Sequence, residues 1–180
     1  IKKEFGVEKT LFVNIGGRWI YTEKIIKELF KFNLVNFQGA RLPLDSGCSN
    51  FTWRILRNDR IDNQLVHLVN EKIDGGPIIF SEKSLFPAYC KIPSDFEKYT
   101  VNQRVIFYKK FIEQIVKNKD FHLKFQTDYT GRYNPRINTE QNGWIDWNLK
   151  STELISFINA FDDPYAGSCT MVTNKNFKKV

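Results

Sequence analysis

Two short apolar runs with a helical pattern between them constrain the fold of this chain more than any other feature. Residues 11–15 form an apolar run that ends at Gly16-Gly17, which is typical of a buried strand and a tight turn. Thr22 is then well placed as a helix N-cap, because apolar residues recur behind it at helical spacing. Residues 34–37 form the next apolar run, which is short enough for a strand. Strand, helix and strand in this order predict an α/β fold with a right-handed parallel crossover.

The rest of the chain continues with strand-like and helix-like segments. In chain order we expect a helix over residues 49–56, strands over 64–70 and 77–80, a helix over 101–117, a loop over 128–143, a strand over 143–147 and a helix over 151–161. The longest helix is expected to bury an apolar stripe of Val105, Ile106, Tyr108, Ile112, Ile115 and Val116. Ser151 is expected to cap the last helix, with Leu154, Ile155 and Ile158 facing inward.

The composition limits the class of protein. A chain of 180 residues that is 42% hydrophobic is long enough for one domain with a normal core, with or without a small appendage. No apolar run is long enough to span a bilayer, so no membrane partner is expected. The three cysteines are far apart, which predicts free thiols in a reducing, cytoplasmic compartment and no metal site. The net charge of +7 comes from scattered lysines, which are typical of solvated helix faces.

Two polar motifs mark a candidate site. The first is Asn36-Phe37-Gln38-Gly39-Ala40-Arg41-Leu42-Pro43, and the second begins at His67 and ends in the turn Asp74-Gly75-Gly76-Pro77. A carboxamide, a second polar side chain two residues later and a carboxylate before two glycines are parts of a proton-handling site. Taken alone, Asn36 is typical of a strand end, Asp74 of a plain turn, and His67 of a histidine with a structural hydrogen bond.

The first motif resembles the Asn-x-His…Leu-Pro signature of the formyltransferases that use 10-formyltetrahydrofolate. The second resembles the family's other signature, in which a histidine precedes an Asp-x-Gly-x-Ile turn by seven residues. Residues 131–167, with the turn Pro164-Tyr165-Ala166-Gly167, resemble the stretch after the catalytic domain in methionyl-tRNA and sugar-nucleotide formyltransferases. The resemblance covers most of the chain from Leu11 onward, and the two signatures occur in the family's order.

This resemblance implies a Rossmann-like α/β formyltransferase core, followed by a small C-terminal α+β segment. The catalytic domain is expected over residues 1–120, and a linker with the C-terminal subdomain over residues 121–180. The family's catalytic domain begins with earlier strands, and its longer members continue into a further C-terminal domain. The resemblance therefore implies that N-terminal sequence, and in longer members C-terminal sequence, lies outside this chain.

The resemblance assigns catalytic roles to three residues. Asn36 would donate a hydrogen bond to an oxyanion, and Asp74 would be the carboxylate that tunes and relays protons. Gln38 stands where the family has a histidine, and its amide carries no charge and does not titrate near neutral pH. Three explanations are open: a deliberate replacement that traps a complex, a natural relative with low or no activity, or another group such as His67 that takes over the proton.

The resemblance also implies a folate site. In the family, the loop after the strand at residues 11–15 lines the pterin pocket, and the residues assigned to cofactor binding are Trp19, Ile20, Tyr21, His67, Gly75 and Gly76. An ordinary strand-to-helix turn with Trp19 in the core fits the residues equally well. The remaining aromatic and basic candidates are expected to be packing or solvated residues: Trp53, Trp144, Trp147, Tyr165, Arg132 and Arg136.

The expected function is N-formyl transfer from 10-formyltetrahydrofolate to the amine of a nucleotide-linked amino sugar. The net charge of +7 mildly favours a methionyl-tRNA acceptor as an alternative. Gln38 favours a non-catalytic folate- or sugar-binding protein as a second alternative. The sequence leaves the acceptor and homo-oligomerisation open.

Overall fold

The computed structural model describes residues 6, 9–17, 19–117, 119–127, 131–171 and 177–179, the last three through their backbone alone. The chain divides into two compact units that interleave along the sequence. The first comprises Ile1–Ser46, Asp62–Lys83 and Gln103–Tyr133, and the second comprises Gly47–Ile61, Ser84–Asn102 and Asn134–Val180. The domain boundary expected at residue 120 stays a prediction.

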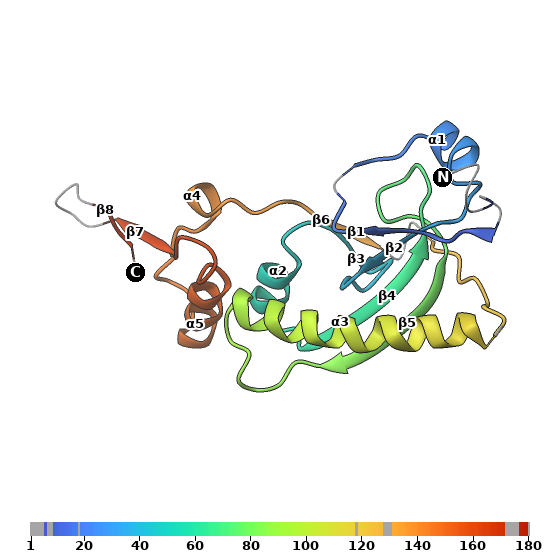
Figure 1. The fold of residues 1–180 in the computed structure, drawn as a ribbon. Helices are drawn as coiled ribbons and strands as arrows, with labels where there is room; N and C mark the ends of the chain where they lie inside the picture. The colour runs from blue at the N-terminus through green and yellow to red at the C-terminus, as the bar shows by residue number, and fades with distance from the viewer. Residues whose placement is uncertain are drawn as a thin grey trace. The chain divides into compact units, whose positions relative to one another are not determined.

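Figure 1 shows the order of the helices and strands along the chain. They are β1 (Phe12–Ile15), α1 (Glu23–Glu28), β2 (Leu34–Gln38), β3 (Asp45–Gly47), α2 (Asn50–Leu56), β4 (Ile61–Leu68), β5 (Ile78–Leu85), α3 (Pro93–Val116), β6 (Arg132–Asn134), α4 (Thr139–Asn142), α5 (Ser151–Ala160), β7 (Cys169–Met171) and β8 (Phe177–Lys179). None of the helices in the described part of the chain combines the length and the hydrophobicity that a membrane span requires.

The first unit is built on a four-stranded sheet with the strand order β1-β2-β4-β5. β1 and β2 are parallel, with Phe12 opposite Leu34. α1 connects these strands, and its N-cap Thr22 accepts a hydrogen bond from the backbone N–H of Ile25. The predicted α/β fold with a parallel crossover is confirmed. β2 and β4 are antiparallel, so the sheet is mixed.

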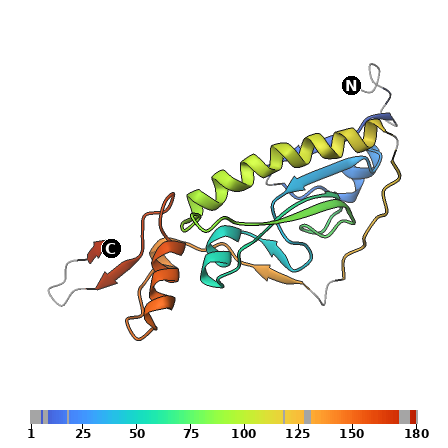
Figure 2. The same ribbon diagram turned by 90° about the horizontal axis from the view of Figure 1, so that it is seen from below.

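Side chains of the sheet and of α3 form the hydrophobic core of the first unit. Val35, Phe37 and Val66 of the sheet are buried together with Phe107 and Phe111 of the helix. The rings of Phe37 and Phe111 meet edge to face, with their centroids 5.4 Å apart. The C-terminal half of α3, drawn in yellow, runs alongside the strands in both views (Figures 1 and 2). This helix therefore closes the face of the sheet on which these core residues lie.

The prediction that the long helix buries the stripe with Val105, Ile112 and Val116 is wrong, because a different face of the helix packs on the sheet. Val105, Ile112 and Val116 are 52%, 49% and 74% exposed, whereas Phe107 and Phe111 are 1% and 2% exposed. The helix carries apolar residues on two faces, and the aromatic face buries more carbon surface against the sheet than the β-branched face would. The helix is also longer than predicted, because it begins at Pro93, where a proline fits the first turn.

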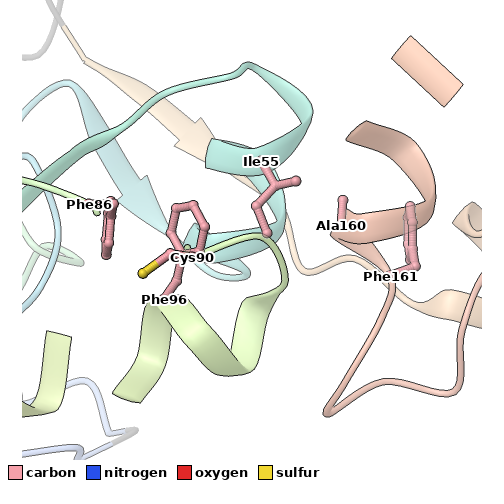
Figure 3. Close-up of a cluster of buried hydrophobic side chains, with 6 residues drawn as sticks. All are labelled: Ile55, Phe86, Cys90, Phe96, Ala160 and Phe161. Carbon is pink, nitrogen blue, oxygen red and sulfur yellow. The ribbon is translucent and has the colours of Figure 1, made fainter. Parts of the chain in front are cut away.

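The second unit has a core of its own, which Figure 3 shows. It consists of six buried side chains, the aromatic cluster: Ile55, Phe86, Cys90, Phe96, Ala160 and Phe161. Arg60 donates hydrogen bonds to the carbonyl oxygens of Phe86, Pro87 and Cys90, with its Nη1 2.7 Å from the last of these. Its guanidinium also lies over the Phe96 ring. One arginine thus fixes the backbone that leads into α3.

Four smaller expectations also need correction. Residues 143–147 do not form a strand, because Trp144 makes only an isolated bridge and its indole bonds to the Glu140 carbonyl instead of packing in a sheet. The short elements β6 and α4 interrupt the predicted loop, of which residues 128–130 lie outside the described part. Lys150, not Ser151, occupies the N-cap position of α5. Ile155 is 59% exposed and does not face inward.

Candidate active site

Polar side chains lie in a row across three neighbouring strands of the first unit. Asn14 of β1 is opposite Asn36 of β2, and Asn36 is opposite His67 of β4. Directly opposed residues project from the same side of a sheet, so the register alone brings these side chains together. Gln38 follows Asn36 by two residues and therefore projects from that side as well. We call Asn14, Asn36, Gln38 and His67 the polar row.

Hydrogen bonds run along the polar row in one direction. Asn14 Nδ2 donates to Asn36 Oδ1 at 3.0 Å, and Asn36 Nδ2 lies 3.2 Å from His67 Nε2. Gln38 Nε2 is 3.5 Å from the same imidazole nitrogen. On the other side of the ring, His67 Nδ1 is 2.7 Å from the carbonyl oxygen of Leu68. A carbonyl only accepts, so Nδ1 carries the proton and Nε2 is the acceptor of the two amide donors.

The imidazole of His67 is enclosed and uncharged at neutral pH. Its residue is only 3% exposed. Burial lowers the pKa of His67 below its ordinary value of 6.5, and this effect outweighs the Leu68 hydrogen bond and the Asp74 carboxylate, which both raise it. Nε2 of the neutral imidazole carries a lone pair, so it can accept a proton when an amide N–H gives way. The polar row therefore contains one group that can take up a proton near physiological pH.

The turn that carries Asp74 is held in a specific backbone conformation. Asp74 has a φ of 55°, in the left-handed region that few non-glycine residues adopt. Gln126 Nε2 donates to the carbonyl oxygens of Asp74 and Gly76, at 2.7 and 2.6 Å. A Cβ added to Gly76 would lie 1.7 Å from the Leu68 carbonyl oxygen and 3.4 Å from His67 Nδ1. The turn therefore needs a glycine there, so that its backbone can pass beside the imidazole.

The segment after Gln38 is fixed by a buried carboxylate. Asp45, which is 2% exposed, accepts from Arg41 Nη2 at 2.9 Å and from Arg132 Nε at 2.7 Å. Burial alone would raise the pKa of Asp45, but the hydrogen bonds and charges of Arg132 and Arg41 prevail and hold it below its ordinary value. The carbonyl oxygen of Ala40 also accepts a buried hydrogen bond from Asn63 Nδ2 at 2.8 Å. These contacts anchor the chain directly after the site.

The loop after β1 presents apolar side chains to solvent. Trp19 is 75% exposed and Ile20 is 66% exposed, so the alternative in which Trp19 belongs to the core is wrong. Tyr21 is partly buried, with its ring edge-on to Phe30. Within the described residues, Trp19 and Ile20 form no hydrogen bond or ring contact with the polar row. Their role in cofactor binding, with that of Gly75 and Gly76, stays a prediction.

The structure adds two residues that the sequence patterns did not single out. Asn14 extends the row to β1, and a Cβ on Gly17 would lie 2.1 Å from its Oδ1, so this amide also touches the loop after β1. Its only signal in the sequence is a polar residue inside an apolar run. Gln126, which ties the Asp74 turn, has no signal at all, because it lies outside every motif.

Trp53, Trp147 and Arg132 make contacts that are typical of structural residues. Trp53 Nε1 donates to the Pro135 carbonyl oxygen at 3.0 Å, and Trp147 Nε1 donates to Thr170 Oγ1 at 2.9 Å. Arg132 lies in β6 and not in a loop, and it pairs with the buried Asp45 although its own side chain is 45% exposed. No three histidine, cysteine, aspartate or glutamate side chains among the described residues gather into a set that could hold a metal ion.

Comparisons with known proteins identify the class of fold. The chain is similar to an N-formyltransferase from Helicobacter canadensis solved with folinic acid and dTDP-3-aminofucose, with a TM-score of 0.73, 21% identity, and coverage of 89% of this chain and 58% of that one. It is equally similar to a 4-N formyltransferase from Francisella tularensis, with a TM-score of 0.73, 19% identity, and coverage of 93% and 69%. The fold is that of the formyltransferases.

A comparison of sequences also finds a similar formyltransferase. The chain is 24% identical over 136 residues to methionyl-tRNA formyltransferase from Chlorobium limicola. The aligned residues cover 76% of this chain and 42% of that protein. This chain therefore spans less than half the length of that curated relative. No protein-family model matches the chain. The resemblance to formyltransferases that the two motifs indicate is confirmed by these similarities.

Proposed function

We propose that this protein is a folate-dependent N-formyltransferase that acts on the amine of a nucleotide-linked amino sugar. The observation that carries the proposal is the polar row, which joins Asn36, Gln38 and His67 by hydrogen bonds on a formyltransferase fold. Asp74 acts electrostatically on the same imidazole. The Helicobacter canadensis protein was solved with folinic acid and dTDP-3-aminofucose, which supports 10-formyltetrahydrofolate as the donor and a nucleotide-linked amino sugar as the acceptor.

The chemistry needs an oxyanion donor and a path for one proton. The acceptor amine attacks the formyl carbon, a new C–N bond forms, and the carbonyl oxygen becomes an oxyanion. Asn36 carries an amide N–H that can stabilise this oxyanion. The bond between the formyl carbon and N10 of the folate then breaks, and the proton lost by the amine is received at N10. Asp74 supplies a fixed negative charge that stabilises a positively charged proton carrier beside it.

The exposed loop after β1 is the proposed site of the pterin ring. Trp19 and Ile20 are large apolar side chains exposed to solvent, directly after the strand that contributes Asn14. Aromatic and aliphatic side chains of this kind cover flat rings in ligand sites. His67 of β4 would bound the same ligand, together with Gly75 and Gly76 of the β4–β5 connection. The tight approach of Gly76 to the imidazole leaves its backbone close to the reacting groups.

A tRNA acceptor is the second candidate, because the curated relative is a methionyl-tRNA formyltransferase and the chain has a net charge of +7. Binding of tRNA depends on phosphate contacts and weakens steeply as the salt concentration rises. Sugar-nucleotide transfer depends on a small acceptor and lacks this steep dependence. Turnover of methionyl-tRNA with a strong salt dependence, and none of amino-sugar nucleotides, would replace the sugar proposal by this candidate.

The direct test uses the full-length protein that contains this chain. It is incubated with 10-formyltetrahydrofolate and a panel of dTDP-linked and UDP-linked amino sugars, and the products are analysed by mass spectrometry. We expect one acceptor to gain a formyl group, and Asn36→Ala to lower the rate by about 10²–10³-fold. Binding of folinic acid is measured in parallel by calorimetry.

The binding measurement separates the remaining possibilities. Folinic acid binding without turnover of any acceptor, in the wild type and in Gln38→His, would favour a non-catalytic folate-binding protein. Turnover that appears only in Gln38→His would show that Gln38 disables an otherwise complete site. Absence of both binding and turnover would contradict the proposed function.

A further inference from the structure

The polar row lacks a titrating group at Gln38, but it holds one directly beside that position. His67 Nε2 lies within 3.2 Å of Asn36 Nδ2 and 3.5 Å of Gln38 Nε2. Neither amide can accept and release a proton near neutral pH. The chain contains two histidines, and the other, His122, is exposed and outside the row. His67 is therefore the only imidazole that the described structure places against the two amides.

We propose that His67 is the catalytic base of this site and carries the proton that Gln38 cannot carry. The inference rests on the proposed formyl transfer. The Gln38 contact is the longer of the two at Nε2, so it is the weaker and the one that an incoming amine N–H displaces most easily. Nε2 has one lone pair, so the Asn36 N–H also leaves Nε2 and turns to the oxyanion as the amine proton moves to the ring. The base then touches the amine at the nitrogen that already holds the lone pair.

The proton balance follows from this placement. As the amine nitrogen bonds to the formyl carbon, one amine proton moves to His67 Nε2, which gives an imidazolium. Its Nδ1–H remains on the Leu68 carbonyl oxygen, 2.7 Å away. As the bond from the formyl carbon to N10 breaks, Nε2 returns the proton to N10, and the neutral imidazole is restored. No oxidant, metal or further reactant takes part in this sequence.

The surroundings of His67 favour this cycle over a purely structural role. From β2 the neutral amides of Asn36 and Gln38 face the ring, and from the β4–β5 connection Asp74 and Gly76 lie near it. Asp74 is the charged group that acts on the imidazole, and it stabilises the imidazolium. Burial keeps the resting ring neutral and therefore ready to accept a proton. The Leu68 contact fixes the tautomer that presents the lone pair to the site.

The test compares four forms of the full-length protein: the wild type, His67→Gln, Gln38→His, and the double variant with both changes. If His67 is the base, His67→Gln lowers kcat/KM by about 10²–10⁴-fold in the wild-type background. The same change costs far less in the Gln38→His background, because an imidazole then stands at the neighbouring position. His122→Gln is the matched control and leaves kcat/KM unchanged.

A pH profile separates a base from a structural residue. The wild-type kcat/KM falls at low pH with an apparent pKa below 6.5, as His67 becomes protonated. In the double variant the apparent pKa of this fall in kcat/KM changes, because the imidazole at position 38 titrates instead of His67. Nitrogen-15 spectra of the two histidine rings give a readout that needs no activity. They are expected to show His67 as the Nδ1–H tautomer, with His122→Gln assigning the signals.

The outcomes distinguish this inference from the proposed function. Equal rates for the wild type and His67→Gln overturn it, and so does an equal loss in both backgrounds, since His67 would then only support the row. Turnover in Gln38→His with none in the wild type overturns the role of His67 but keeps the proposed function. No turnover in any form contradicts both.

Discussion

His67 in the polar row of the first unit and Phe96 in the aromatic cluster of the second unit are both closed to solvent, but their surroundings are built in opposite ways. His67 is 3% exposed and Phe96 is 1% exposed. In the row, the imidazole and amide atoms are matched donor to acceptor. In the cluster, carbon packs against carbon, as Figure 3 shows for Phe86 and Phe96, whose ring centroids are 4.2 Å apart. His67 and Phe96 are therefore similarly buried, but hydrogen bonds hold the first and apolar packing holds the second.

The difference has an energetic consequence. A neutral hydrogen bond adds about 1 kcal/mol net to stability, whereas a buried phenylalanine contributes about 3–5 kcal/mol when truncation to alanine is the measure. Changes in the polar row should therefore alter chemistry more than stability. Changes in the aromatic cluster should alter stability and leave the chemistry of the folded molecules intact.

The largest effect on stability is expected at Gly76, whose backbone packs closely beside His67 of the polar row. Gly76→Ala would place a Cβ 1.7 Å from the Leu68 carbonyl oxygen, so the turn beside His67 has to move. We expect a loss of about 5 kcal/mol in the free energy of unfolding, or a folded protein without activity. Chemical denaturation and the formyl-transfer assay measure both. Glu71→Ala, at an exposed position of the same β4–β5 connection, is the control. An unchanged, active Gly76→Ala protein would refute the tight packing of the turn.

The next effect belongs to the aromatic cluster. Phe96→Ala should lower the free energy of unfolding by about 4 kcal/mol, because it leaves a cavity in a cluster whose six residues are each at most 7% exposed. The rate per folded molecule should stay unchanged. Val105→Ala on the same helix, at a site that is 52% exposed, should cost less than about 0.5 kcal/mol. Equal costs for the two variants would mean that the buried and exposed faces of α3 are assigned wrongly.

A smaller effect with a pH signature is expected at Asp45. Asp45→Asn should cost about 2–3 kcal/mol at pH 7, less than a fully buried ion pair, because the Arg132 side chain is 45% exposed. The folded-state pKa of Asp45 lies below its ordinary value of 3.8, so its contribution is complete above that pH and is lost as the pH falls further. The gap between wild type and variant should therefore narrow below pH 4 in denaturation curves, by linkage. The exposed Asp120→Asn variant should show no such gap.

The smallest effect on stability is expected in the loop after β1. Trp19→Ala should change the free energy of unfolding by less than about 0.5 kcal/mol, since Trp19 is 75% exposed. Its affinity for folinic acid should fall roughly tenfold, as expected for the loss of a stacking aromatic side chain. Tyr89→Ala, at an aromatic residue that is 68% exposed in the second unit, is the control for calorimetry. Unchanged affinity in Trp19→Ala would remove this loop from the folate site.

Much of the fold and part of the site could be predicted from the sequence, because the signals are local. The β1–α1–β2 crossover follows from two apolar runs and one N-cap, and the structure confirms it. The motif residues Asn36 and Gln38 share a strand with period two, so their common side follows from spacing. Their contact with His67 depends on the β2–β4 register, which is a tertiary property.

The features that the sequence did not predict have a common physical cause. The long helix carries two apolar faces, and only the sheet decides that Phe107 and Phe111 are buried while Val105 is exposed. No pattern in the sequence marks Gln126, because its side chain donates hydrogen bonds to two carbonyl oxygens that are 52 and 50 residues away. Where a residue acts through a partner that is distant in sequence, local patterns give no signal.

The most direct test of the whole account is the rate of formyl transfer per folded molecule in Asn36→Ala, measured together with its free energy of unfolding. Asn36 bridges Asn14 and His67 in the polar row and is the proposed oxyanion donor. The account predicts a rate about 10²–10³-fold lower with a stability loss of only about 1 kcal/mol. A folded Asn36→Ala protein that transfers formyl groups at the wild-type rate would contradict it.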